Sequence, residues 1–170
     1  MPRFASVVIP SAQRCLAFAD LILAGIPAKD FARMPKGVKT NHPAFNFGHL
    51  ALYPDRIFNM IGRTNQEQPD AKFTDLFAAG KECLDDPEGK VYPPMDKIVE
   101  RFRTRHESVV KAIPEVSEDV WDRPNPNEKM VERFPTVGSI VAFLLSAHMM
   151  VHLGQISTWR RCMGLPPAVI

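Results

Sequence analysis

The sequence is poor in the features that mark several large classes of protein. It holds three cysteines, Cys15, Cys83 and Cys162, which form no CxxC pair, and their odd number does not suggest a disulfide framework. Its 21 basic and 19 acidic side chains leave a formal charge of only +2, without a basic run. We therefore expect free thiols in a reducing cytoplasm and no nucleic-acid partner.

Long hydrophobic runs are absent as well. The most apolar window, residues 140–151, is too short to cross a bilayer and contains His148. The apolar amino-terminal stretch is interrupted by Gln13, Arg14 and Asp20, so it has no clean signal-peptide core. There is no internal repeat and no alternation of the β-strand type. These absences predict one all-α domain over residues 1–170, with no membrane span.

What the sequence does contain is four apolar segments with helical periodicity, separated by its sixteen prolines. Because proline breaks a helix interior, the spacing predicts helices at 10–25, 43–62, 94–113 and 136–163. We expect Asn41 to cap the second helix and Pro54 to kink or restart it. A short helix is expected at 71–80. Four such helices predict a four-helix bundle, and the long linkers 63–93 and 114–135 indicate crossover connections.

Two histidines stand four residues apart in the apolar stretch SAHMMVHLGQ. His148 and His152 share the apolar face of the last helix, roughly 5–6 Å apart at Cβ. A bare HxxxH pair is more often two satisfied core histidines than a metal site. Each unsatisfied buried ring costs roughly 1–3 kcal/mol, however, and one shared divalent metal would satisfy both. Gly154, two residues later, is expected to let the helices approach closely there.

A third ligand must come from another helix, and two histidines lie on inward stripes. His49 follows Gly48, which would let another backbone come close, and His106 lies on the stripe of the third helix. His42 precedes a proline at a helix start, where a capping or surface role is expected. Spacing favours His49 over His106 without deciding between them.

The surroundings of the histidines offer few further candidates. A metal-bound histidine usually donates its other N–H to a polar partner, and Gln155, Asn46 and Asp55 are near in sequence. No inward carboxylate beside a histidine is available as a general base. If His49 is the third ligand, we expect a core histidine at His106, with a role as a base or as a partner of a ligand histidine as the alternative. We expect a free thiol at Cys83, which could instead lie over the site, and solvated side chains at Arg160 and Arg161, with contact to an anionic thiol cofactor as the weaker alternative.

The segments HPAFNFGHLALYPDRIFNMIG and HMMVHLGQISTWRRCMGLPP resemble the second and fourth helices of the DinB-like superfamily, which includes YfiT-like thiol transferases. The sharpest marks are GHL and HxxxHxGQ, and DDPEGKVYPPMDKIVERF is similar to the loop and third-helix start of some members. The resemblance implies an up-down-down-up four-helix bundle whose three histidines bind a divalent cation. It places the metal ligands at His49, His148 and His152.

The resemblance also implies a metal, a type of reaction and a class of substrate. The metal is expected to be zinc or nickel, although iron also accepts imidazole ligands. Three protein ligands leave room for water, as in catalytic sites. We therefore expect a homodimeric, metal-dependent thiol S-transferase or hydrolase acting on a small molecule, such as a low-molecular-weight thiol. The alternatives are a non-catalytic, stress-related module that binds a metal or small ligand, and a plain helical scaffold.

Overall fold

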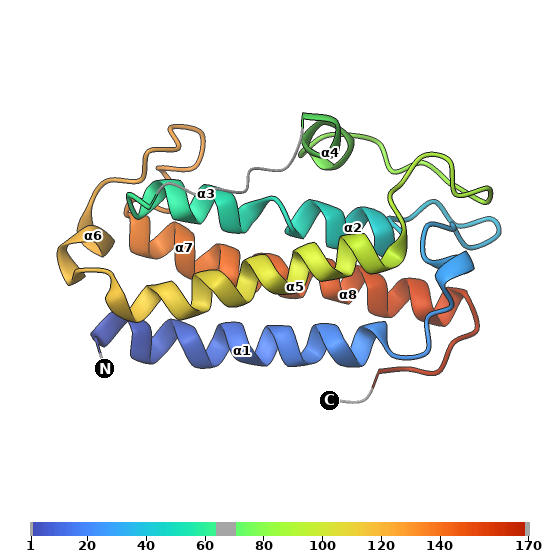
Figure 1. Ribbon diagram of the computed structural model, residues 1–170, viewed down its shortest axis with the longest axis horizontal. Helices are drawn as coiled ribbons and strands as arrows, with labels where there is room; N and C mark the ends of the chain where they lie inside the picture. The colour runs from blue at the N-terminus through green and yellow to red at the C-terminus, as the bar shows by residue number, and fades with distance from the viewer. Residues whose placement is uncertain (1, 64–70, 169–170) are drawn as a thin grey trace.

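The computed structural model describes residues 2–63 and 71–168, and these residues form helices and loops without a β-strand (Figure 1). The all-α prediction is therefore confirmed, while residues 64–70 of the predicted linker lie outside the described part. The longer helices are α1 (Arg3–Leu23), α2 (Pro43–Leu50), α3 (Tyr53–Met60), α5 (Met95–Ala112), α7 (Val137–Leu145) and α8 (Ala147–Cys162). The shorter elements are η1 (Ala28–Asp30), α4 (Ala71–Phe77), η2 (Ile113–Glu115) and α6 (Glu118–Asp122). Of these four, α4 corresponds to the short helix predicted at 71–80, and the other three were not predicted.

Four helical rods lie along the long axis of the molecule: α1, α2 with α3, α5, and α7 with α8 (Figure 1). Helix α2 contacts α5 and α8, and α1 contacts α5, α7 and α8. Buried apolar side chains form two clusters, one around α2 and α8 and the other around α3 and α7. The two clusters meet at the level where both composite rods are interrupted.

The first composite rod is interrupted between α2 and α3. Pro54 has no N–H to donate to the carbonyl of Leu50, and it instead occupies the first turn of α3, where no donor is needed. The N–H of Leu52 donates to the His49 carbonyl at 3.2 Å, which closes the end of α2. The predicted restart at Pro54 is confirmed.

The second composite rod is broken at Ser146, so the prediction of one helix over 136–163 is wrong at this point. Ser146 has φ −130° and ψ −86°, outside the helical region. Its hydroxyl donates to the Ala142 carbonyl at 2.5 Å and its N–H to the Phe143 carbonyl at 3.3 Å. Such local serine bonds compete with the helix ladder. The apolar periodicity continues in phase across the break, which is why the sequence pattern does not reveal it.

Helix α1 begins at Arg3 instead of at Pro10, which lies inside the helix. Pro10 has no N–H for the carbonyl of Ser6, four residues earlier. Both residues are exposed, so water can reach this carbonyl. Ala5, Val8 and Ile9 are buried and extend the apolar stripe across the proline. Burial of this stripe outweighs the lost hydrogen bond.

Helix α2 is capped by His42, and the prediction that Asn41 caps it is wrong. The Nδ1 atom of His42 accepts the N–H of Phe45 at 3.2 Å, and its Nε2 atom donates to the Leu84 carbonyl at 2.9 Å. The ring is fully buried. The predicted capping role of His42 is confirmed, and its alternative placement on the surface is wrong.

Arg160 was expected in solvent, but it is only 3% exposed. Its guanidinium donates to the carbonyls of Ile22, Ala24 and Pro166 at 2.7 to 3.2 Å. These carbonyls lie at the end of α1 and beyond α8, where the backbone has no helical donor left. Arg160 therefore ties two chain segments together, whereas Arg161 is exposed as expected.

Two helical stretches, Arg3–Leu23 and Val137–Cys162, are long and apolar enough to cross a membrane by length and composition alone. In each of them 44% of the most apolar window is buried inside the structure. The core helix of a bundle meets the same criterion, so these stretches are weak evidence for a membrane span.

Candidate metal centre

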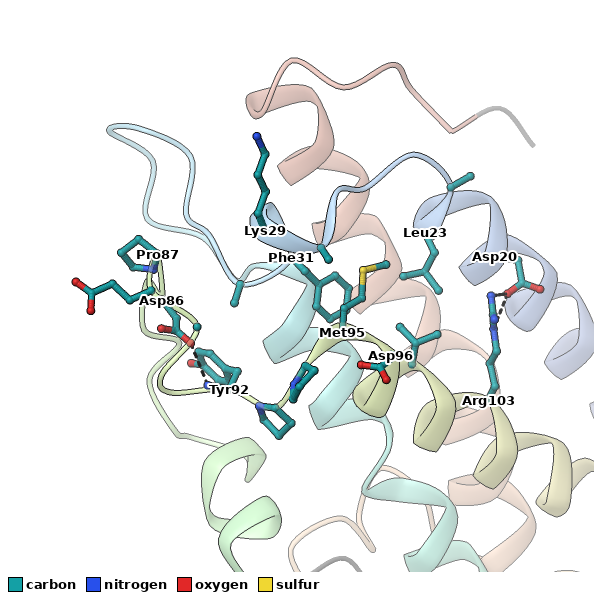
Figure 2. Close-up of a pocket in the computed structure, with 18 residues that line it drawn as sticks. Asp20, Leu23, Lys29, Phe31, Asp86, Pro87, Tyr92, Met95, Asp96 and Arg103 are labelled. Carbon is teal, nitrogen blue, oxygen red and sulfur yellow. Dashed lines mark hydrogen bonds and ion pairs between the residues drawn. The ribbon is translucent and has the colours of Figure 1, made fainter.

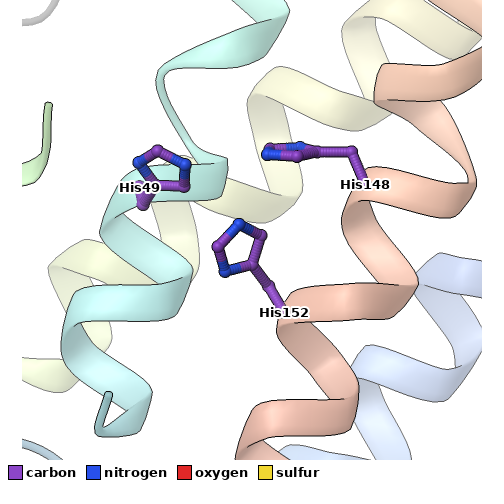
Figure 3. Close-up of side chains that lie close together, drawn as sticks. All are labelled: His49, His148 and His152. Atoms are coloured by element: carbon purple, nitrogen blue, oxygen red, sulfur yellow. The ribbon is translucent and has the colours of Figure 1, made fainter. Parts of the chain in front are cut away.

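Three histidines from two helices converge at the level where the rods are interrupted (Figure 3). His49 lies in the last turn of α2, and His148 and His152 lie in the first two turns of α8. One ligand atom from each ring lies within 4.8 Å of the other two. Of the two candidates for the third ligand, the structure brings His49, and not His106, into this group with the HxxxH pair.

Hydrogen bonds hold two of the rings in one tautomer. The Nδ1 atom of His49 lies 2.8 Å from the Phe77 carbonyl oxygen, which can only accept, so this nitrogen carries the proton. The Nδ1 atom of His152 lies 2.8 Å from Oδ1 of Asn46, whose amide nitrogen donates to the Asn41 carbonyl at 3.2 Å. Both rings therefore leave Nε2 unprotonated, and this is the nitrogen that could bind a metal.

Gln155 and Asp55, the other polar residues predicted near the site, have different roles. Burial is the main cause that lowers the pKa of His152, and a side-chain hydrogen bond between His152 and Gln155 raises it and partly offsets burial. Asp55 is buried and binds Arg101 at 2.8 Å and Arg105 at 2.6 Å, both on α5. Gln155 thus belongs to the histidine site, while Asp55 joins α3 to α5.

His148 is the ring with the least support from its surroundings. Its Nδ1 atom is buried and has no hydrogen-bond partner in the described residues. The rings of Tyr53 and Phe143 lie beside it, with centroids 4.4 and 5.6 Å away. A buried nitrogen without a partner costs free energy, and a metal ligand bond or a bound ligand would remove that cost.

The three imidazoles are neutral at neutral pH. Burial, and then the neighbouring histidines, lower the pKa of His148 to about 3, and burial lowers the pKa of His152 to about 4. Burial also lowers the pKa of His49. Neutral imidazole is the form that binds a metal. In a tetrahedral zinc site the ligand atoms lie roughly 3.4 Å apart, so ring movements of about 1 Å would complete the centre.

Tyr53 is a residue of this site that the sequence analysis missed. Its hydroxyl lies 3.1 Å from Nε2 of His49, and because that nitrogen accepts, the hydroxyl donates. Burial raises the pKa of Tyr53, although the charge of Arg56 opposes the rise, so the phenol stays protonated. The signal was available, because Tyr53 follows His49 by four residues and restarts the helix at α3. A metal at His49 would free this hydroxyl to act on a bound ligand.

The two glycines beside the histidines differ from expectation. At Gly48 the group that comes close is the Phe77 side chain and not a backbone, since an added Cβ would lie 2.3 Å from the ring. Gly154 is exposed, and an added Cβ there would meet nothing within 4 Å. The prediction that Gly154 permits close helix packing is therefore wrong.

We expect Gly48→Ala to destabilise the protein by about 1–3 kcal/mol, because the buried Phe77 ring must move. Since the Phe77 carbonyl orients His49, the variant should also bind metal more weakly. Gly154→Ala is the matched control and should be neutral or more stable by about 0.5–1 kcal/mol. Denaturant unfolding and metal titration measure both effects. Equal stability of the two variants would show that the Phe77 contact does not constrain α2.

Two other predicted roles are confirmed. His106 is 1% exposed, and its Nδ1 atom lies 2.7 Å from the Phe102 carbonyl, as for a core histidine. Cys83 is a free, buried thiol whose pKa is raised to about 11, chiefly by burial. It lies near His42 and Tyr92, at the opposite end of α2 from His49, so it is not a nucleophile of the histidine site.

A cavity of about 870 Å³ lies away from the histidines, between the end of α1, η1 and the start of α5 (Figure 2). Leu23, Phe31 and Met95 line its apolar part, and Asp96 and Lys29 are among its charged residues. Its volume is within the range of small-molecule sites. None of the three clustered histidines lines it.

Comparison with known proteins gives one clear result. No curated protein and no solved structure matches the chain. The sequence model of the DinB superfamily matches residues 14–156, a range that includes His49, His148 and His152. This match begins within α1 and ends within α8, so it includes parts of all four rods, and the resemblance carried by GHL and HxxxHxGQ is confirmed. The chain belongs to the DinB superfamily.

Proposed function

We propose that the protein binds one divalent metal ion through His49, His148 and His152 and acts as a metal-dependent thiol S-transferase or hydrolase on a small molecule. The observation that carries this proposal is the state of the rings: two have an unprotonated Nε2 atom, and the third has a buried nitrogen without a partner among the described residues. Zinc or nickel suits three imidazoles, with iron as the alternative.

The chemistry follows from the donor set. Three neutral imidazoles would leave a bound divalent ion its +2 charge, and this charge would lower the pKa of a water or thiol bound to it. The Phe77 carbonyl and the Asn46 amide hold two rings in place. Tyr53 supplies a protonated hydroxyl beside Nε2 of His49. This hydroxyl is suited to donating a hydrogen bond to a ligand or leaving group.

The proposal includes the fold and the setting expected of the family. The direction of the colours in Figure 1 supports an up-down-down-up bundle, since α1 and α8 run one way and α2 and α5 the other. His49 comes before the break of its rod, and His148 and His152 come after the break of theirs, so two rods that run in opposite directions bring the three rings together. A homodimer and a cytoplasmic location remain predictions.

The second candidate function is a stress-related module that binds a metal or small ligand without turnover. The cavity of about 870 Å³ outside the histidine site favours it, because this volume accommodates a small molecule. The absence of a carboxylate from the histidine group also fits, since none of the described residues there is an evident base.

One experiment separates the two functions. Protein purified without a histidine tag is loaded with zinc or nickel, its metal content is measured, and thiols with electrophiles, esters and amides are screened for turnover. One metal per chain with turnover supports the enzyme. One metal per chain without turnover supports the binding module, and trace metal after loading contradicts both.

A further inference from the structure

Arg56 adds positive charge beside a site that is already cationic when loaded. It is exposed on α3, and its guanidinium carbon lies 4.8 Å from the centre of the Tyr53 ring. The Tyr53 hydroxyl is in turn 3.1 Å from Nε2 of His49. One side chain therefore separates the guanidinium from the place where a metal would bind.

The Tyr53 ring places Arg56 beside the histidines. The centre of that ring lies 5.0 Å from the centre of the His49 ring and 4.4 Å from the centre of the His148 ring. Because these three side chains come from three helices, Arg56 stands beside the site itself and not only on one helix surface.

No counter-charge for Arg56 is present in the described residues. No carboxylate among residues 2–63 and 71–168 lies within 4.0 Å of its guanidinium. Its neighbour Asp55 is buried and bound by Arg101 and Arg105. A loaded site with three neutral ligands and Arg56 would thus be strongly positive, which attracts and holds anions.

We propose that Arg56 recognises a carboxylate of the substrate, so that the preferred ligand is a low-molecular-weight thiol that also carries a carboxylate. This inference rests on the proposed metal-dependent function. The planar guanidinium can pair with a carboxylate through two parallel hydrogen bonds, which gives both affinity and orientation. The thiol would meet the metal, and the carboxylate would meet Arg56 beside Tyr53.

A matched pair of thiols tests the proposal: 3-mercaptopropionate and its neutral methyl ester, titrated calorimetrically into the zinc-loaded protein. The acid should bind at least about tenfold more tightly than the ester. In Arg56→Gln the preference should disappear. Arg161→Gln, which removes an exposed arginine of α8, should keep it. Zinc content is measured in all three proteins, so that loss of metal is not mistaken for loss of recognition.

The outcomes distinguish this inference from the function on which it rests. Equal affinity of the wild-type protein for acid and ester overturns the role of Arg56 but leaves thiol binding intact. A preference that survives in Arg56→Gln also overturns it, because the metal or another group then recognises the carboxylate. A zinc-loaded protein that binds neither thiol overturns both the thiol substrate and the inference.

Discussion

His148→Ala should lower the affinity for zinc or nickel by more than 100-fold and leave only trace metal after purification. Loss of a supporting residue around a metal site costs about 10–100-fold, and loss of a ligand exceeds that. Among the three clustered histidines, His148 has a buried ring nitrogen without a hydrogen-bond partner in the described residues. A bound metal or ligand would offset the free-energy cost of burying that nitrogen. Metal analysis and competition with a chelator measure the change.

The same variant should lose the stabilisation that metal gives. At a free metal concentration of about 1,000 times Kd, binding stabilises the native state by roughly 4 kcal/mol, and this gain should fall to about 1.4 kcal/mol or less in His148→Ala. Val151→Ala is the control, because Val151 lies on α8 between the two histidines and is 60% exposed. Circular dichroism checks that the helices remain. A His148→Ala protein with full metal content would rule out the proposed site.

Arg160→Met should destabilise the protein by about 3 kcal/mol and lower its Tm by roughly 6–12 °C. The variant keeps an apolar stem but removes the donor from the buried carbonyl of Ile22 and from the partly buried carbonyls of Ala24 and Pro166. Hydrogen bonds from a charged donor are worth about 1.5–3 kcal/mol each, and water entering the gap recovers part of the loss.

The adjacent Arg161 provides the matched control. Arg161→Met removes the same group from an exposed position one residue further along α8, and it should change stability by less than about 0.5 kcal/mol. Thermal and denaturant unfolding of the metal-free proteins keep the comparison independent of the histidine site. If both variants unfold alike, the guanidinium of Arg160 does not hold the end of α1 to the segment after α8.

The helices were predictable wherever their cause is local. Apolar residues at helical spacing located α5 within one residue at each end, and Pro54 located the restart at α3. Gly164, with φ +74°, follows the end of α8 as expected for a residue without a Cβ. Where contacts compete with the local pattern, the prediction was wrong. The periodicity did not reveal the break at Ser146, and it did not predict that residues 3–9 extend α1.

The three clustered histidines were predictable from the sequence, but the groups that orient their rings were not. The HxxxH spacing and the GHL stretch are sequence features, and they led to His148, His152 and His49. The partners that orient the rings are distant in the chain, 28 residues for Phe77 and 106 for Asn46. A carbonyl such as that of Phe77 leaves no mark on the sequence, because every residue has one.

By itself the sequence determined that the chain is all-helical, that it belongs among DinB-like proteins and that three histidines lie on inward faces. Periodicity and short motifs contain this information, because helix formation and i to i+4 neighbours depend on residues close in the chain. The tertiary structure decided which tautomers the rings adopt, that Tyr53 and Arg56 stand beside them, and that Arg160 is buried. Each of these depends on packing between helices, where distant residues meet and water is excluded.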